Sequence, residues 1–345
     1  MSRSLQAVVT GGGGFLGSKI VSMLLQEGYF VRSFSRRTYP KLVAQGVACH
    51  VGDLTNAMAV RAALEDADVV FHVAAKAGMW GNQREYYLPN VVGTRNVLEA
   101  CRRNGVRKLV YTSTASVIFD GRDARNAHED AAFARKRLTY YASTKAEAER
   151  LVLEANGPGL ATVALRPHAI WGPGDNQVLP RLVALHRVNK LRLVGRGDNL
   201  VDTTFVENAA QAHLDAAKRL EPGSPAAGRV YFISQGDPRP VRDLLNGFMR
   251  SAGLPPVEKS ITFPVAYCTA WLFEKSYRLL GVAAEPPITL YFVLLMARDH
   301  YFDISAARRD LGYHPAIGIE EGLEKLRQHY RESGTLGPAR ATAGT

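Results

Sequence analysis

The sequence predicts an α/β fold, in which helices cover both faces of a doubly wound parallel sheet. Three observations support this fold class. Short apolar segments alternate with helical patterns of apolar residues up to about residue 170, as in parallel strands joined by helices. Glycines 11–14 directly follow the first apolar segment. Beyond Pro167 the periodicity breaks up around glycine-rich loops, so we expect a smaller, mainly helical C-terminal lobe.

The first predicted strand covers residues 5–10, a short apolar run that suits a buried strand. Gly11, Gly14 and Gly17 follow at the spacing G-x-x-G-x-x-G, and Gly28 ends the helical pattern after them. Such glycines let backbone N–H groups approach a pyrophosphate, which the dipole of the helix favours. A flexible glycine loop is the alternative. The order of strand, glycines and helix favours a Rossmann-type dinucleotide site.

The second predicted strand, residues 29–35, indicates which dinucleotide is bound. An acidic residue at its end would bind the adenosine ribose hydroxyls and repel a 2′-phosphate. Instead, Ser35 is followed by Arg36 and Arg37, and guanidinium groups make charge-assisted contacts with phosphate oxygens. Solvated loop arginines are the alternative, but we expect NADP(H) to be preferred over NAD(H). After a third strand, Asp53 either accepts from the adenine amino group or only stabilises a turn.

Further strands complete the predicted sheet, at residues 68–75, 108–113, 161–166 and 228–233. Helices fill the gaps, notably over residues 85–104 and 141–156. The predicted domains are a dinucleotide-binding domain, residues 1–170 with a returning segment at about 200–235, and a substrate-binding lobe, residues 171–199 and 236–332. Residues 333–345 have the composition of a disordered tail.

Tyr141 and Lys145 lie one helical turn apart, so they share a face of the predicted helix. The Lys145 ammonium is therefore expected beside the Tyr141 ring, where it would lower the pKa of the phenol from ~10 toward working pH. A phenol tuned in this way is a general acid or base for a carbonyl. Such a pair occurs by chance on many exposed helices. Its place about 130 residues after the glycine run favours a catalytic role.

Size and composition exclude several classes of protein. The chain has 345 residues and 46% hydrophobic content, which is ample for a packed core. Its three cysteines are widely spaced, so we expect no disulfide framework, no bound metal and a reducing, cytoplasmic setting. No segment approaches the ~20 uninterrupted apolar residues of a membrane span, and the early first strand leaves no room for a signal peptide.

The net charge of +11 is spread along the chain in short basic groups. There is no run of five basic residues, no nucleic-acid motif and no interleaved aromatic platform. We therefore interpret the basic groups as solvated faces that attract anions, and expect no nucleic-acid partner. An anionic cofactor and a small, lipid-like keto or hydroxy acid would suffice as partners.

Together, these features resemble the extended short-chain dehydrogenase/reductase family, and within it the 3β-hydroxysteroid dehydrogenase group. The matching segments follow the family's order, at residues 10–17, 52–54, 72–75, 90–94, 112–117, 141–145 and 166–167. The resemblance implies that Tyr141 is the acid/base and that Lys145 holds the nicotinamide ribose. Thr114 would hold the substrate oxygen where the family more often has serine, with Ser113 as second candidate. Asn90 would support a proton relay or serve as a buried packing amide.

The same resemblance implies a set of cofactor-binding residues along the first half of the chain. They are Gly11, Gly14, Phe15, Leu16, Gly17, Ser35, Arg36, Asp53, Leu54, Ala74, Ala75, Lys76, Tyr141, Lys145 and Pro167. It further implies a homodimer built on helices 85–104 and 141–156. An assembly with other enzymes of the pathway is a further expected partner.

Two branches of the group handle an oxygen at C3 beside a carboxyl-bearing carbon. One reduces 2-alkyl-3-ketoalkanoic acids to 3-hydroxy acids in long-chain olefin biosynthesis, and the other is the decarboxylating sterol-4α-carboxylate 3-dehydrogenase. The likeness to the first extends through residues 191–195, 231–234 and 308–313. The likeness to the second lies in residues 115–119 and 201–208. Since NADPH is usually held reduced in cells, Ser35 and Arg36 favour the reductase.

The substrate carboxylate needs a cation, because burying it unpaired would be costly. Lys76 and Arg84, in the loop after the fourth strand, are candidates, with a surface role as the alternative for each. His168 is a further candidate for a substrate contact, or a structural histidine. The late apolar segments 263–273 and 288–296 are core helices, a channel for an alkyl chain or sterol, or a membrane-surface contact.

Two other functions fit the same motifs. A non-enzymatic redox sensor would keep the cofactor fold without catalysis, but the presence of both Tyr141 and Lys145 argues against it. A nucleotide-sugar epimerase or dehydratase would share the fold and the catalytic residues, and would retain its cofactor through the cycle. Fold-level likeness cannot choose among these chemistries.

Overall fold

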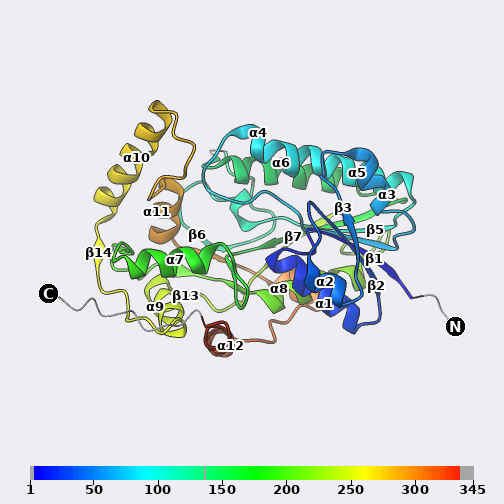
Figure 1. Cartoon of the computed structure of the whole chain (residues 1–345). Helices are drawn as coiled ribbons and strands as arrows, with labels where there is room; N and C mark the ends of the chain where they lie inside the picture. Colours follow the sequence, from blue (N-terminus) through cyan, green and yellow to red (C-terminus); the bar gives the residue numbers. More distant parts are fainter. Residues whose placement is uncertain (1–3, 136, 335–345) are drawn as a thin grey trace.

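The computed structural model describes residues 4–135 and 137–334. A sheet flanked by helices forms one end of the molecule, and a second group of helices that includes α10 forms the other (Figure 1). The predicted tail over residues 333–345 lies outside the described residues from residue 335 onward.

Seven parallel strands form the central sheet, in the order β12-β7-β5-β4-β1-β2-β3. They are β1 (Gln6–Thr10), β2 (Phe30–Ser35), β3 (Ala48–Val51), β4 (Val69–His72), β5 (Lys108–Thr112), β7 (Ala161–Pro167) and β12 (Arg229–Ile233). The predicted doubly wound parallel sheet is confirmed. Because the strand order reverses between β1 and β4, the carboxyl ends of these two strands mark the crevice where such sheets bind ligands.

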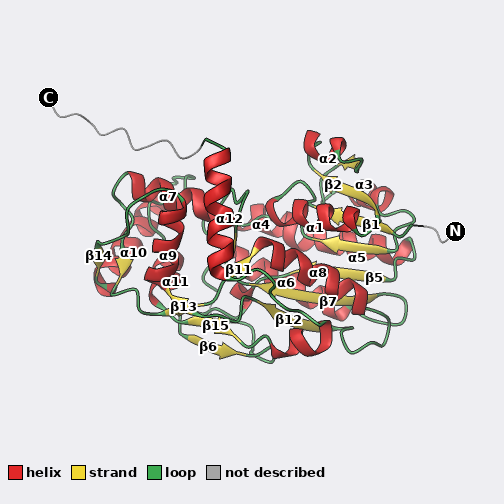
Figure 2. Cartoon of the chain, turned by 90° about the horizontal axis from the view of Figure 1, so that it is seen from below, coloured by secondary structure: helices red, strands yellow, loops and turns green. Residues whose placement is uncertain are grey.

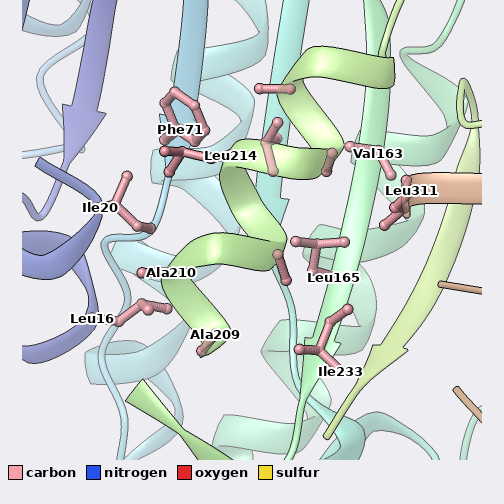
Figure 3. Close-up of a cluster of buried hydrophobic side chains, with 14 of the residues drawn as sticks. Leu16, Ile20, Phe71, Val163, Leu165, Ala209, Ala210, Leu214, Ile233 and Leu311 are labelled. Carbon is pink, nitrogen blue, oxygen red and sulfur yellow. The ribbon is translucent and has the colours of Figure 1, made fainter. Parts of the chain in front are cut away.

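Helices cover both faces of this sheet. They are α1 (Phe15–Gln26), α2 (Pro40–Ala44), α3 (Ala57–Ala63), α5 (Gly93–Arg103), α6 (Tyr140–Glu154) and α8 (Val206–Arg219). Successive strand residues point to opposite faces. Phe71 packs on one face with α1 and α8, in the cluster that Figure 3 shows, whereas Val70 packs on the other with α3, α5 and α6. Two covered faces explain why the strands are apolar at nearly every position.

The helix predicted over residues 85–104 consists of three pieces. These are α4 (Gln83–Tyr87), a π-helical turn (Leu88–Val92) and α5. Pro89 lies in the turn and has no N–H to continue the helical ladder. At the start of α5, a Cβ on Gly93 would lie 2.7 Å from Leu54 Cβ, so the helix approaches the end of β3 closely. Single π turns of this kind are frequent at functional sites.

A second sheet joins the two ends of the molecule. Its four strands are β13 (Arg239–Pro240), β10 (Leu200–Val201), β15 (His300–Phe302) and β6 (Ala124–Ala127). β6 comes from the first half of the chain and lies beside β15 (Figure 2). Short pairs are formed by β8 (Ile170–Trp171) with β11 (Thr204–Phe205) and by β9 (Leu193–Val194) with β14 (Ser260–Ile261). The predicted domain boundaries stay a prediction.

The C-terminal lobe is mainly helical. Its helices are α7 (Val178–Arg187), α9 (Val241–Ser251), α10 (Phe263–Leu279), α11 (Leu290–Ala297) and α12 (Ile319–Glu332), besides the short turns Ala115–Val117 and Ala307–Leu311 elsewhere. α11 buries Tyr291, Val293 and Leu294, as expected of a core helix. α10 buries Ala266 and Ala270 in the core of the lobe, while Trp271 and Leu272 are exposed, so only one side of this segment is a core face. None of the described helices is long and apolar enough to span a membrane.

Candidate active site

Tyr141 lies in the first turn of α6. The helix begins here because Thr139 caps it, its hydroxyl oxygen accepting from the Ala142 N–H at 3.1 Å. Tyr141 is half-buried, and its hydroxyl is hydrogen-bonded to Thr114. Burial raises the pKa of the Tyr141 phenol, and the bond to Thr114 offsets only part of that rise. The phenol is therefore held in its protonated form, ready to donate.

Lys145 is buried one turn further along α6. Its ammonium donates to the Thr112 carbonyl oxygen at 2.6 Å and lies 4.1 Å from the centre of the Tyr111 ring. Burial lowers the pKa of Lys145 to about 7, although the Glu149 carboxylate opposes the shift. The prediction that Lys145 lowers the pKa of Tyr141 is wrong for this structure, because the ammonium points to the end of β5 and not to the phenol.

Thr114 and Ser113 were the two candidates for holding the substrate oxygen. Ser113 donates from Oγ to Glu149 Oε2 at 2.5 Å, within a buried pair in which Arg166 Nη2 lies 2.6 Å from Glu149 Oε1. Thr114 instead begins the short helical turn after β5, where its hydroxyl oxygen accepts from the Ser116 N–H at 3.2 Å. Only Thr114 of the two is hydrogen-bonded to Tyr141.

Asn90 lies in the π-helical turn and joins two parts of the site. Its Oδ1 accepts from the Lys76 N–H at 2.7 Å, and its Nδ2 donates to the Lys76 carbonyl at 3.0 Å. The same Nδ2 donates to Thr144 Oγ1 on α6, also at 3.0 Å. These contacts use both ends of the amide to fix the loop after β4 against α6. The structure thus gives Asn90 a positioning role, in line with the packing alternative.

The glycine turn after β1 brings the backbone close to the start of α1. Gly11 has φ +72°, and a Cβ on Gly17 would lie 2.2 Å from the Gly11 carbonyl oxygen. Gly14 precedes α1 without a side-chain cap, so the N–H groups of Phe15 and Leu16 in the first turn are offered to a ligand. This cradle fits the pyrophosphate of a dinucleotide.

Thr10 and His72 hold the loop after β4 beside the glycine turn. Thr10 Oγ1 accepts from the Val73 and Ala74 N–H groups at 3.2 Å and lies 2.8 Å from His72 Nδ1. His72 Nε2 reaches Thr94 Oγ1 at 3.0 Å. Burial, helped by the charge of Lys145, lowers the pKa of His72 to about 3, so this histidine is a neutral bridge. The loop that follows contains Ala75, another predicted cofactor contact.

At the outer edge of the sheet, Ser35 ends β2 with its Oγ 3.4 Å from Ser33 Oγ. Asp53 Oδ1 accepts from the N–H and the hydroxyl of Thr55, which lowers the pKa of Asp53; the exposed Arg36 adds to this electrostatically. Asp53 Oδ1 thus stabilises a turn, and the contact with the adenine amino group stays a prediction. Arg37 stacks on the Tyr39 ring, with its guanidinium carbon 5.0 Å from the ring centre.

The other predicted residues lie around this core. Leu54 packs against α5, and Pro167 ends β7. Lys76 is exposed, with its ammonium 6.0 Å above the Tyr86 ring, and Arg84 is exposed on α4. His168 follows Pro167 and is buried, with Nε2 2.7 Å from His300 Nδ1. The structure does not bring Lys76 or Arg84 into contact with Tyr141 or Thr114.

Two residues beside Thr114 were not identified from the sequence. Ser116 Oγ accepts from the Thr114 hydroxyl at 3.1 Å and from the Tyr291 hydroxyl at 2.8 Å. Tyr291 lies on α11, 175 residues further along the chain. Its only signal in the sequence was a hydroxyl-bearing ring within an otherwise apolar segment.

The comparisons with known proteins agree with this site. The model of the 3-beta hydroxysteroid dehydrogenase/isomerase family matches residues 8–265. The 2-alkyl-3-oxoalkanoate reductase of Stenotrophomonas maltophilia is 45% identical to this chain, over 94% of this chain and 98% of that protein. Mouse sterol-4-alpha-carboxylate 3-dehydrogenase, decarboxylating, is 34% identical, over 96% of this chain and 92% of that protein.

Solved structures are similar along almost the whole chain. MoeE5 in complex with UDP-glucose and NAD has a TM-score of 0.74 at 26% identity, over 95% of this chain and 99% of that chain. The crystal structure of gox2253 has a TM-score of 0.79 at 24% identity, over 97% of this chain and all of that chain, and shows the fold alone. The chain therefore belongs to the 3-beta hydroxysteroid dehydrogenase/isomerase family and is an NAD(P)-dependent oxidoreductase of the short-chain dehydrogenase/reductase type.

Proposed function

We propose that the protein reduces the 3-keto group of 2-alkyl-3-oxoalkanoic acids with NADPH, giving 2-alkyl-3-hydroxyalkanoic acids in long-chain olefin biosynthesis. The observation that carries this proposal is the 45% identity, along nearly the whole chain, to bacterial enzymes of that name. One is from Stenotrophomonas maltophilia and the other from Shewanella oneidensis. Tyr141 beside Thr114 supplies the proton donor that reduction of a ketone needs.

The chemistry needs a carbonyl carbon held against the cofactor and a proton delivered to its oxygen. A reduced nicotinamide, when bound, would supply a hydride, that is one proton with two electrons, to the C3 carbon. Tyr141 then donates its phenolic proton to the oxygen that develops negative charge. Thr114 orients that oxygen by a hydrogen bond once its hydroxyl turns from Ser116 Oγ to the substrate. Lys145 donates to the Thr112 carbonyl, and the family resemblance implies that it also holds the nicotinamide ribose.

The preference for NADPH rests on the end of β2. Ser35 leaves space where a carboxylate would repel a 2′-phosphate, and the exposed guanidinium of Arg36 is free to contact phosphate oxygens. Arg36→Ala is expected to raise KM for NADP+ roughly 10-fold and to leave KM for NAD+ unchanged. Arg37→Ala is the matched control, because Arg37 is stacked on Tyr39. Equal KM changes for both cofactors would remove this basis for the preference.

The second candidate is oxidation of a sterol 4α-carboxylic acid with loss of CO2. Its support is the 34% identity to the mouse enzyme of that activity, over 96% of this chain. The substrates share an oxygen at C3 beside a carboxyl-bearing carbon, so the same Tyr141 and Thr114 would serve, with Tyr141 as base. A nucleotide-sugar epimerase is a third candidate, which the similar solved structures support only at the level of the fold.

Oxidation of a defined 2-alkyl-3-hydroxyalkanoic acid separates these candidates. The acid is assayed with NADP+ and NAD+, beside a sterol 4α-carboxylic acid and UDP-glucose. The oxidative direction avoids loss of CO2 from the keto acid before the assay. Turnover of the alkyl acid with preference for NADP+ is the expected result. Turnover of the sterol acid alone, or of UDP-glucose without net cofactor consumption, would overturn the proposal in favour of the corresponding candidate.

A further inference from the structure

Four hydroxyl groups form a continuous chain from the centre of the site into the C-terminal lobe. Tyr141 is hydrogen-bonded to Thr114, Thr114 to Ser116, and Ser116 to Tyr291. The chain thus begins at the proton donor and ends on α11. Tyr291 is buried, and its ring packs edge-on against Phe119 at 5.9 Å, so its hydroxyl is held in place. The first two hydroxyls have a role in the proposed reduction, and the last two have none so far.

Ser116 has a hydrogen to spare. Its oxygen accepts from both Thr114 and Tyr291, at 3.1 Å and 2.8 Å. In this arrangement both neighbouring hydroxyls donate to Ser116, so neither of them takes up the Ser116 hydroxyl hydrogen. A buried or half-buried donor without a partner is costly, so this hydrogen is available to a ligand that brings an acceptor.

A small cavity adjoins these two hydroxyls. Ser116 and Tyr291 line it together with two histidines, His168 and His300, and with apolar side chains. It has room for about one water-sized group, such as one oxygen of a carboxylate. A recess with room for only one water-sized group is too small for an alkyl chain, and its few polar groups are those of Ser116, Tyr291 and the two histidines.

The two histidines supply a place for a proton. The His300 Nε2 hydrogen is directed at the Leu295 carbonyl at 2.8 Å, so a neutral His300 accepts at Nδ1 from His168 Nε2. His168 Nδ1 is then the basic position of the pair. A carboxylic acid that enters with its proton keeps it and donates a hydrogen bond to His168 Nδ1, because burial and the neighbouring His300 hold the pKa of His168 well below its usual value. This avoids burial of an uncompensated charge.

We infer that Ser116 and Tyr291, with His168 behind them, form the recess that binds the carboxyl group of the substrate. In a 3-oxo acid, the carboxyl carbon is two bonds from the carbonyl carbon. One carboxyl oxygen can therefore lie at hydrogen-bonding distance from the ketone oxygen. The 3.1 Å between Thr114 Oγ1 and Ser116 Oγ matches that spacing. The inference rests on the proposed function. It gives Ser116 and Tyr291 the recognition of the substrate carboxyl group that was expected of Lys76 and Arg84.

The test compares an acid with its ester. Kinetics are measured with NADP+ for a 2-alkyl-3-hydroxyalkanoic acid and for its methyl ester, using the native protein, Ser116→Ala and Tyr291→Phe. Each variant is expected to lose roughly 10-fold to 100-fold in kcat/KM for the acid, mainly through KM, with little change for the ester. Tyr267→Phe, in the same aromatic cluster as Tyr291, is the control.

The outcomes separate this inference from the proposed function. Equal losses for acid and ester would mean that Ser116 and Tyr291 only position Thr114, and would overturn the carboxyl recess. A native protein that uses acid and ester equally well would overturn it too, while leaving the ketone reduction standing. No turnover of the acid by the native protein would overturn the proposed function, and the recess with it. Thermal unfolding of each variant shows whether it is folded. If Tyr291→Phe does not fold, Ser116→Ala still tests the recess, because it removes only one hydroxyl group.

Discussion

Proteins usually bury apolar side chains and expose charged ones. The sheet half departs from this by burying charged side chains, and the C-terminal lobe by exposing apolar ones. Beneath the sheet, Lys145, Glu149 and Arg166 are at most 3% exposed. On α10, by contrast, Leu272 is 61% exposed and Leu279 is 88% exposed. Isolated exposed apolar residues are common, but buried charges and grouped exposed apolar residues are informative. The site therefore uses buried polarity in one region, and the lobe leaves an apolar helix face uncovered in the other.

The buried polar groups are tolerated because each has partners. The Lys145 ammonium donates to the Thr112 carbonyl, and the Glu149 carboxylate accepts hydrogen bonds from Ser113 and Arg166. A buried group costs little when paired and a great deal when its partner is removed. The sheet half should therefore respond strongly to small polar changes, and the exposed face of α10 should not.

The largest effect is expected at Tyr141. Tyr141→Phe removes the proton donor without changing the volume of the ring, so kcat should fall roughly 10²-fold to 10⁴-fold in both directions. Tyr140→Phe is the control, because its neighbouring phenol is 46% exposed. Steady-state kinetics and circular dichroism measure activity and folding. Activity of Tyr141→Phe within a few-fold of native would remove Tyr141 from the chemistry.

The next effect concerns stability. Glu149→Gln removes the carboxylate charge that the buried Arg166 contacts, so the free energy of unfolding should fall by about 3–5 kcal/mol. The surface pair of Glu99 and Arg103 offers a control, and Glu99→Gln should cost about 0.5 kcal/mol or less. Urea unfolding measures both. A similar small cost at the two sites would show that burial does not set the strength of the inner pair.

The third effect is a dependence of stability on pH. Burial lowers the pKa of His72 to about 3 and of His213 to about 4, against 6.5 in the unfolded chain. Between pH 6.5 and 4 the unfolded chain therefore binds more protons. The free energy of unfolding should therefore decrease as the pH is lowered through this window, by ~1.4 kcal/mol per pH unit for each histidine.

His213→Gln should reduce the slope of the free energy of unfolding against pH by the contribution of one histidine. His314→Gln, at an exposed histidine, is the matched control. Urea unfolding at pH 7.5 and pH 5.0 gives the slope for each protein. An unchanged slope in His213→Gln would mean that His213 is protonated in the folded protein, contrary to its buried setting.

The two regions also differ in how much of them could be predicted from the sequence. In the sheet half, strand and helix patterns predicted all seven strands. Tyr141 was found from its spacing to Lys145, and Thr114 from the family resemblance of the segment after the fifth strand. Local sequence fixes such positions. The direction in which the Lys145 ammonium points was predicted wrongly, since it depends on packing against β5.

The lobe could be predicted only in outline. Tyr291 reaches Ser116 across 175 residues, and His300 meets His168 across 132. These contacts depend on how α11 and β15 dock onto the first half, which no spacing along the chain encodes. Apolar content likewise predicted two similar helices over 263–273 and 288–296. Only the tertiary structure distinguishes the buried α11 from the exposed α10.

The smallest effect is expected on that exposed helix. Leu272→Glu and Leu279→Glu add charge where the side chains already meet water, so each should change the free energy of unfolding by about 0.5 kcal/mol or less. Leu294→Ala on α11 is the contrast, because emptying a buried leucine site costs about 2–5 kcal/mol. Urea unfolding at two protein concentrations measures all three. A large, concentration-dependent loss in either glutamate variant would show that a second copy of the chain covers α10 in solution, and the contrast between the two regions would then vanish on assembly.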